Sequence, residues 1–338
     1  MKNTFAVYLY DQIFETTGEM SLHEIGDFPL ENMYDYTKRL QSLDYPRILL
    51  RRESFSEYTS VHHPGYVEEL AARSRSEDIE LSFRLSFECL DMWHLLPGFE
   101  YGLGGMYNAI DLMKSGDIDR AFVLTLPSHH AYYDHAHGYC LVNTLAASAR
   151  YAQAKGFRRI LIIDWDFHHG DGTQDIFKDD PAVHTMSSHS ILDLYMAAMR
   201  ATERGTTAYS RTIQADTNIP ITKKGDDQIR EEIRLPGDFF DNRSSVEAFR
   251  KTLKNLEFEP DLILIFDGMD AHEDDFARDA IGWTDEDFDT LMKTALDFAG
   301  RHGCPVIASP GGSYKGGVAE PILKSHLDLL VNYQPKTE

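Results

Sequence analysis

The sequence predicts an α/β fold of three layers, with a mainly parallel sheet between two layers of helices. Short apolar runs rich in β-branched residues recur along the chain, and stretches with helical periodicity separate them. Strands that are covered on both faces read as near-continuous apolar runs, so this alternation is typical of a parallel sheet. The 338 residues contain no internal repeat and no Pro/Ser-rich linker. We therefore expect residues 1–338 to form one domain.

The individual elements can be located from their apolar runs and end signals. The opening "MKNTFAVYLYDQIF" has a short apolar run that soon meets Asp11, which predicts a first strand and not a signal peptide. A helix over 141–156 ends in Lys-Gly, and another over 284–303 begins at Thr284, a candidate N-cap. The clearest strands are expected over 121–126, 159–164, 182–187, 261–266 and 305–309.

The composition restricts the partners and the compartment. The chain has 33 basic and 55 acidic residues, a formal net charge of −22. Such a field repels phosphate backbones and attracts cationic ligands such as polyamines or lysine-rich peptides, so we expect no nucleic acid partner. Cys89, Cys140 and Cys304 are far apart and lack metal-binding spacing, which favours a reducing, cytoplasmic location. No run approaches the roughly 18 apolar residues that span a bilayer, so no membrane partner is expected.

A polar cluster follows each of the five clearest strands. The clusters are "PSHH", "WDFHHGDG", "SHS", "DGMDAHEDD" and "PGGSYKGG", in chain order. In open α/β sheets, ligands bind outside the carboxyl ends of the strands. The five clusters should therefore meet at one edge of the sheet and form a single site.

The clearest chemistry lies in "DWDFHHGDG", residues 164–172. Residues two apart in an extended segment point the same way, so Asp164, Asp166 and His168 should share one side. Carboxylates and an imidazole are natural ligands of a divalent metal, and Asp267 or Asp270 could add another. Two carboxylates and one histidine would leave a position open for water, as in catalytic zinc sites. An isolated Asp-x-His is more often a surface turn, and only the second acidic cluster favours a metal.

Two further segments offer groups for acid–base and electrostatic catalysis. His129 and His130 are adjacent in a loop after a strand, and histidine commonly moves protons near neutral pH. Each would need its own carboxylate to set its role, and Asp164 and Asp171 are available. Tyr314, in a glycine-rich turn, could donate to a developing oxyanion. Taken singly, each feature also fits an ordinary turn, and His135 and His137 stay unassigned.

Together these segments resemble the histone deacetylase and acetylpolyamine amidohydrolase family. "PSHHAYYDHAHGYCLVN" is similar to its His-His segment, and "DWDFHHGDGTQDIF" to its Asp-x-Asp-x-His-His-Gly-Asp-Gly-Thr-Gln signature. "DGMDAHEDD" resembles the segment with the last metal ligand, and "PGGSY" the one with the catalytic tyrosine. "VHHPGYVEEL" (61–70) is a weaker N-terminal match. The resemblance runs from about Val61 to the C-terminal helix, and it implies the arginase–deacetylase type of fold.

The resemblance implies a zinc-dependent amidohydrolase that removes an acetyl or similar acyl group from an amine, such as an acetylpolyamine or acetyl-lysine. One zinc ion would be held by Asp166, His168 and Asp270. His129 would pair with Asp164 and His130 with Asp171, one imidazole taking a proton from water and one returning it to the amine. Tyr314 would polarise the acetyl carbonyl. A structural K⁺ would be bound by Asp164, Asp166, His168 and Ser187, largely through backbone carbonyls.

Other implications concern the substrate pocket and the assembly. Tyr139, His189 and Gly312 are expected to line the pocket, and relatives with small substrates often form homo-oligomers. The chain departs from the family pattern at Ser313, where a glycine is usual before the tyrosine, and at Ser128 before the His-His pair. Residues 21–40 match the N-terminal pattern only loosely. Residues 191–220 lack the usual glycine-rich loop that helps line the channel.

Two alternative functions remain open on the sequence. An arginase-type ureohydrolase with two manganese ions shares the fold, and "DAHEDD" (270–275) superficially resembles such enzymes. It would leave the His129–His130 pair unexplained. A catalytically inactive acyl-lysine-binding protein is suggested by Ser313 and by the altered loop, although every expected catalytic side chain is present.

Overall fold

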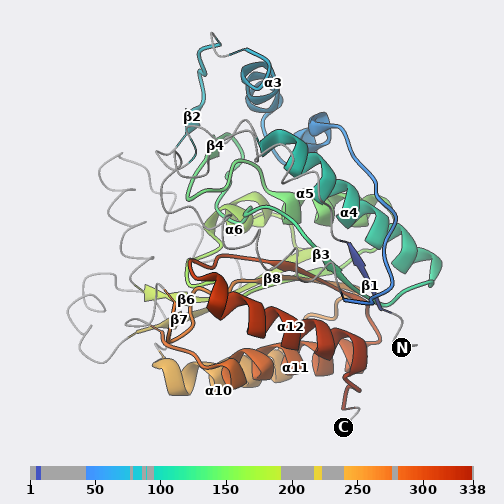
Figure 1. Cartoon of the computed structure of the whole chain (residues 1–338), viewed down its shortest axis with the longest axis vertical. Coiled ribbons are helices and arrows are strands. Elements are labelled where there is room, and N and C mark those ends of the chain that lie inside the picture. Colours follow the sequence, from blue (N-terminus) through green and yellow to red (C-terminus); the bar gives the residue numbers. More distant parts are fainter. Residues whose placement is uncertain are drawn as a thin grey trace.

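A seven-stranded parallel sheet forms the centre of the protein in the computed structural model (Figure 1). The structure describes residues 5–8, 43–76, 79–85, 89, 95–191, 217–222, 240–275 and 281–336. The strands, in spatial order, are β1 (Phe5–Tyr8), β3 (Arg120–Val123), β9 (Val306–Pro310), β8 (Leu262–Asp267), β5 (Ile160–Asp164), β6 (Val183–Ser190) and β7 (Thr217–Ile221). A separate two-stranded sheet pairs β2 (Arg84–Leu85) with β4 (His135–Ala136).

Helices cover both faces of the sheet, which confirms the predicted three-layer α/β/α architecture (Figure 1). One face carries α4 (Leu96–Ser115), α5 (Thr144–Ala154) and α6 (Asp171–Phe177). The other carries α10 (Asn242–Asn255), α11 (Asp285–His302) and α12 (Gly316–Asn332). A short 3₁₀ helix, η2 (Phe55–Ser60), leads into α3 (Pro64–Arg73) and contacts α4 and α5. With both faces covered, β5 and β8 are buried along their whole length, as their apolar sequences require.

Local signals explain where the two predicted helices begin and end. Thr284 caps α11 through a capping box with Asp287, and Gly303, at a φ of 64°, ends it in the left-handed conformation that glycine favours. The helix expected over 141–156 begins three residues later than expected. The cause is Asn143, whose side chain accepts a hydrogen bond from the amide of Ala146 and so acts as the N-cap.

The expected strands are all present, with two informative shifts. The first clear strand ends at Val123, so residues 124–130 form a longer loop than expected. Strand β6 continues through Ser188, His189 and Ser190, which were expected to follow it. Strand β7 lies at the end of the stretch that was expected to be a divergent loop. Residues 21–40 and 192–216, where the other departures from the family pattern fall, lie outside the described residues.

The cysteines and the helices of the described residues are consistent with what the composition suggested. The three cysteines are buried and free. Among the described residues, no helix is both long enough and apolar enough to cross a membrane. The register of the strands brings the ends of neighbouring strands together. Asp164 at the end of β5 is the register partner of Ser187 on β6 and of Phe266 on β8. Asp267 is in turn the partner of Pro310 on β9, so four adjacent strands deliver their following loops to one edge.

Candidate metal and catalytic site

Asp166, His168 and Asp270 lie together at the carboxyl edge of the sheet. One ligand atom from each lies within 4.8 Å of the others. Nδ1 of His168 is 3.1 Å from Oδ1 of Asp166 and 3.0 Å from Oδ2 of Asp270. Asp166 and Asp270 are buried, and His168 is half-buried. The sequence-predicted ligand set is therefore brought together from two separate loops.

Backbone amides hold the two carboxylates in place. The amide of Gly312 donates to Oδ2 of Asp166 over 2.7 Å, and that of Phe167 donates to Oδ1 of Asp270 over 2.8 Å. A Cβ on Gly312 would come within 2.8 Å of both aspartates, so only glycine fits here. Gly268 has the same restriction, since its Cβ would lie 2.4 Å from Cα of Asp166. Two glycines therefore allow the loops after β8 and β9 to close around the carboxylates.

The electrostatics of this cluster fit a divalent cation. Burial and the neighbouring charge of Asp166 raise the pKa of Asp270 to about 7. Oδ2 of Asp270 is buried and receives no hydrogen bond, although Nδ1 of His168 lies close by. Burial opposes ionisation of Asp166 as well, but His129 and His168 lower its pKa below the usual range. Two buried carboxylates with an oxygen left over and one imidazole are a donor set that suits zinc.

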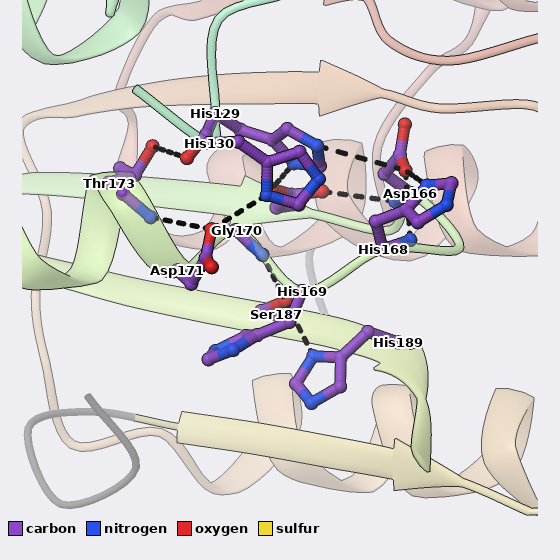
Figure 2. A network of polar contacts seen from close by, with 12 residues as sticks. His129, His130, Asp166, His168, His169, Gly170, Asp171, Thr173, Ser187 and His189 are labelled. Carbon is purple, nitrogen blue, oxygen red and sulfur yellow. Dashed lines mark hydrogen bonds and ion pairs between the residues drawn. The ribbon is translucent and has the colours of Figure 1, made fainter. Parts of the chain in front are cut away.

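The two adjacent histidines each bond to a different aspartate, and Figure 2 shows the contact of His130 with Asp171. Nδ1 of His129 is 2.8 Å from Oδ2 of Asp164, and Nδ1 of His130 is 2.6 Å from Oδ1 of Asp171. All four side chains are buried. Nε2 of His129 lies 3.9 Å from Oδ1 of Asp166, so this imidazole faces the ligand cluster. The pairing in the structure is the one that the family resemblance implied.

The two histidine–aspartate pairs occupy different electrostatic environments. Burial lowers the pKa of His129, but the charges of Asp164 and Asp166 outweigh it and raise the value to about 9. Asp171 is also buried, yet the neighbouring His130 and His137 lower its pKa below the usual range. Without a metal, His129 thus holds a proton more readily than an ordinary histidine does, because two carboxylates lie beside it. A metal at Asp166 would reduce that preference.

Tyr314 is held beside the cluster by one carboxylate, Asp275, for which the sequence predicted no role. Its ring centroid lies 6.4 Å from that of His168. Buried Asp275 accepts hydrogen bonds from the amides of Tyr314 and Lys315, each over 3.1 Å, and from the hydroxyl of Ser313 over 3.1 Å. Ser313, the departure from the family's glycine, is therefore part of this contact. Burial raises the pKa of the Tyr314 hydroxyl, which stays protonated and able to donate.

The three expected pocket residues have different positions. Gly312 touches the ligand cluster, and Tyr139, at a φ of 61°, is half-buried and close enough to Tyr314 to influence its pKa. His189 has no exposed surface, so the expectation that it lines a pocket is wrong. The physical reason is that β6 continues through it, and its Nδ1 lies 2.7 Å from the Ser187 hydroxyl (Figure 2). The monovalent cation site at Asp164, Asp166, His168 and Ser187 stays a prediction.

Asp267, the alternative metal ligand, points away from the cluster. It accepts a hydrogen bond from Nε1 of Trp165 over 2.9 Å, and its other oxygen lies 2.7 Å from Nδ1 of His326 on α12. All three side chains are fully buried on the face of the sheet that α12 covers. Asp270, and not Asp267, therefore lies beside Asp166 and His168, because β8 ends at Asp267 and the chain turns before Asp270.

Two further contacts support the loop that carries His129 and His130, and the sequence predicted neither of them. The hydroxyl of Tyr132 donates to Oδ2 of Asp171 over 2.8 Å, and His62 bonds the loop backbone at Tyr132 and Asn143. The weak family match "VHHPGYVEEL" contains His62 and is the one feature of the sequence that could have indicated the His62 contact. Nothing in the sequence distinguished Tyr132 from its neighbour Tyr133.

The comparisons with known proteins agree with this geometry. The family model described as "Histone deacetylase domain" matches residues 29–330. The chain belongs to the histone deacetylase family. It is 28% identical over 305 residues to human "Polyamine deacetylase HDAC10", covering 86% of this chain and 42% of that protein. It is 29% identical over 276 residues to "Acetoin utilization protein AcuC" of Bacillus subtilis, and the match covers 79% of this chain and 66% of that protein.

A solved structure extends the likeness to the whole fold. The HD domain of HDA15 superposes with a TM-score of 0.69 at 20% sequence identity, covering 98% of this chain and 91% of that one. Together with the parallel seven-stranded sheet, this places the chain in the arginase–deacetylase type of α/β fold. The chain spans 42% of the length of the human relative and 66% of the bacillary one.

Proposed function

We propose that this protein is a zinc-dependent amidohydrolase that removes an acetyl or similar acyl group from an amine. The observation that carries the proposal is one arrangement: two histidine–aspartate pairs directly beside the cluster of Asp166, His168 and Asp270. An isolated metal cluster could be structural. Two buried imidazoles that are each oriented by their own carboxylate are the arrangement that acid–base catalysis uses.

The residues divide the chemistry among them. Zinc in such a site supplies Lewis acidity, which lowers the pKa of water and polarises a carbonyl. Asp164 and Asp171 orient His129 and His130, so that the free ring nitrogens can accept a proton from water and deliver one to the leaving amine. Tyr314 donates its hydroxyl proton as a hydrogen bond to the developing oxyanion. The buried carboxylates keep the imidazoles in one tautomer, with Nδ1–H toward the aspartate.

The proposed substrate is a small cationic acetylated amine, such as an acetylpolyamine, with acetyl-lysine as the alternative. The net charge of −22 supports a cation, because it attracts a positively charged amine toward the site. Two of the relatives above carry the names polyamine deacetylase and acetoin utilization protein, and the first is consistent with a polyamine. We place the protein in the cytoplasm, as one domain that could form homo-oligomers.

Acetate release by the zinc-loaded protein tests the proposal. The assay compares an acetylpolyamine with an acetyl-lysine peptide, and Asp166→Ala is the control. We expect release by the wild type and a loss of at least about a thousandfold in the variant, because removing a metal ligand removes both the metal and its Lewis acidity.

The other outcomes separate the alternatives. Activity that persists in metal-free Asp166→Ala would refute the metal-dependent mechanism. Binding of acetylated ligand without release of acetate, over a wider acyl panel, would favour the inactive binding protein. Urea production by a form with two manganese ions would favour the ureohydrolase.

A further inference from the structure

A second group of metal-ligating side chains lies next to the proposed catalytic cluster. One ligand atom from each of His130, His137 and Asp171 lies within 4.8 Å of the others. His130 is 5% exposed and Asp171 is 4% exposed, while His137 is half-buried. The proposed reaction uses His130 and Asp171 but gives no role to His137. His137 is also the member of the group that solvent reaches most easily.

The surroundings hold this group in a narrow range of positions. Oδ1 of Asp171 lies 2.6 Å from Nδ1 of His130, and Oδ2 accepts the Tyr132 hydroxyl over 2.8 Å. The His130 and His137 rings are perpendicular, with centroids 5.2 Å apart. A Cβ on Gly138, at a φ of 50°, would lie 2.5 Å from Cδ2 of His130. The chain after His137 is therefore packed against the His130 ring.

A tight turn fixes the backbone of His137. The amide of His137 donates to the carbonyl of Cys140 over 3.3 Å, and the amide of Cys140 donates back over 2.9 Å. Directly before His137, strand β4 ends at Ala136 and pairs with β2. The backbone of His137 is thus restrained, while its side chain is half-buried.

Two imidazoles and a carboxylate are ligands that zinc accepts in proteins. In a tetrahedral site the ligand atoms lie about 3.3 Å apart, which follows from metal–ligand distances near 2 Å. The ligand atoms of His130, His137 and Asp171 lie within 4.8 Å of one another, so small side-chain movements would bring them to this spacing. His130 and Asp171 already lie closer than that spacing. A metal between them would replace the hydrogen-bonded proton.

We propose that His130, His137 and Asp171 form a second, weaker zinc site whose occupation inhibits the enzyme. Binding there takes His130 out of proton transfer, so excess zinc lowers the rate while the ion at Asp166, His168 and Asp270 stays bound. The inhibition rests on the proposed function, whereas the binding does not. The second site is weaker because His130 and Asp171 already bond to each other, and that contact must be broken.

Direct measurement of bound zinc tests the site without reference to activity. The protein is dialysed against increasing free zinc chloride, and the zinc per chain is measured by mass spectrometry. We expect a second equivalent at higher zinc in the wild type, with affinity for it reduced by about tenfold or more in His137→Ala and His137→Asn. His135→Ala is the matched control, because His135 lies two residues away and pairs with Asp134 instead. It should keep the second equivalent.

Asp166→Ala separates this site from the proposed catalytic one. The variant should lose the tighter equivalent and keep the weaker one. Loss of both equivalents in Asp166→Ala would mean one two-metal cluster and would overturn the proposal. So would a second equivalent that both His137 variants bind like the wild type, or a wild type that binds one equivalent at every zinc concentration.

The ratio of rates with and without excess zinc then tests the inhibition. We expect the zinc concentration for half-inhibition to rise by about tenfold or more in the His137 variants and to stay unchanged in His135→Ala. Equal inhibition in the wild type and the His137 variants would overturn the regulatory role. A protein that releases no acetate would instead refute the proposed function, and the zinc measurements would still decide whether the second site exists.

Discussion

His62 is completely buried, and both of its ring nitrogens bond to the backbone of the loop that carries His129 and His130. Nδ1 lies 2.7 Å from the carbonyl of Tyr132, and Nε2 accepts the amide of Asn143 over 2.8 Å. Only the neutral ring with a proton on Nδ1 satisfies both contacts. Burial lowers the pKa of His62 to about 4. The buried His62 side chain thus joins Tyr132 and Asn143, two separate points of the segment that follows His130.

The lowered pKa of His62 predicts an acid-sensitive loop. The unfolded chain binds a proton at His62 near pH 6.5, and the folded protein binds it only near pH 4, so acid favours unfolding across this window. Between pH 7 and pH 4.5 this group should reduce the free energy of unfolding by about 2 kcal/mol. Urea unfolding of the wild type, His62→Gln and the control His135→Gln measures the difference. If His62→Gln showed the same extra pH dependence as the wild type, His62 would not be its source.

The loops after β8 and β9 are joined by Asp275, and this contact controls the position of Tyr314. Asp275→Ala would leave the amides of Tyr314 and Lys315 without their acceptor and would remove the shorter of the two hydrogen bonds of the Ser313 hydroxyl. We expect turnover to fall by about tenfold or more, toward that of Tyr314→Phe, because small displacements of a catalytic group are costly. KM and the bound zinc should change much less, since neither depends on the Tyr314 hydroxyl.

Asp274→Ala is the matched control for Asp275, because its side chain is exposed and only its carbonyl accepts from Lys315. Steady-state kinetics and zinc content are measured for all three variants. A wild-type turnover in Asp275→Ala, or an equal loss in Asp274→Ala, would contradict the positioning role. Loss of zinc from Asp275→Ala would mean that it supports the ligand loop instead of the tyrosine.

The sequence predicted the strands and the site they carry for the same physical reason. Buried parallel strands are continuous apolar runs, and a change to polar residues marks the end where ligands bind. Asp166 and His168 could therefore be placed beside Asp267 or Asp270, and the family resemblance implied Asp270. The limits of β6 could not be predicted this way. Ser188, His189 and Ser190 look like a loop, but they belong to β6, and His189 bonds to the Ser187 hydroxyl inside the sheet. The contacts of Asp275 and His62 could not be predicted from the sequence either, because each joins segments that are far apart in the chain.

The whole molecule has a formal net charge of −22, and two of its buried acids lie in the cluster of Asp166, His168 and Asp270, so we expect zinc to stabilise the fold. Without a metal, buried Asp166 and Asp270 share one imidazole, and burial keeps the pKa of Asp270 near 7. A ligand at a thousand times its dissociation constant stabilises the folded state by about 4 kcal/mol. For a chain of this size, that corresponds to a rise in melting temperature of roughly 5–10 °C.

Thermal unfolding of zinc-loaded and chelator-treated protein measures this effect. The Asp166→Ala variant should melt at the same temperature with and without stoichiometric zinc, because it lacks the ligand that links the loops after β5 and β9 through Gly312. Equal melting temperatures for the loaded and the stripped wild type would show that these strand-end loops keep their positions without the ion. Asp270 would then be neutralised by a proton, and the melting temperature of the stripped protein should fall as the pH rises through 7, where Asp270 ionises.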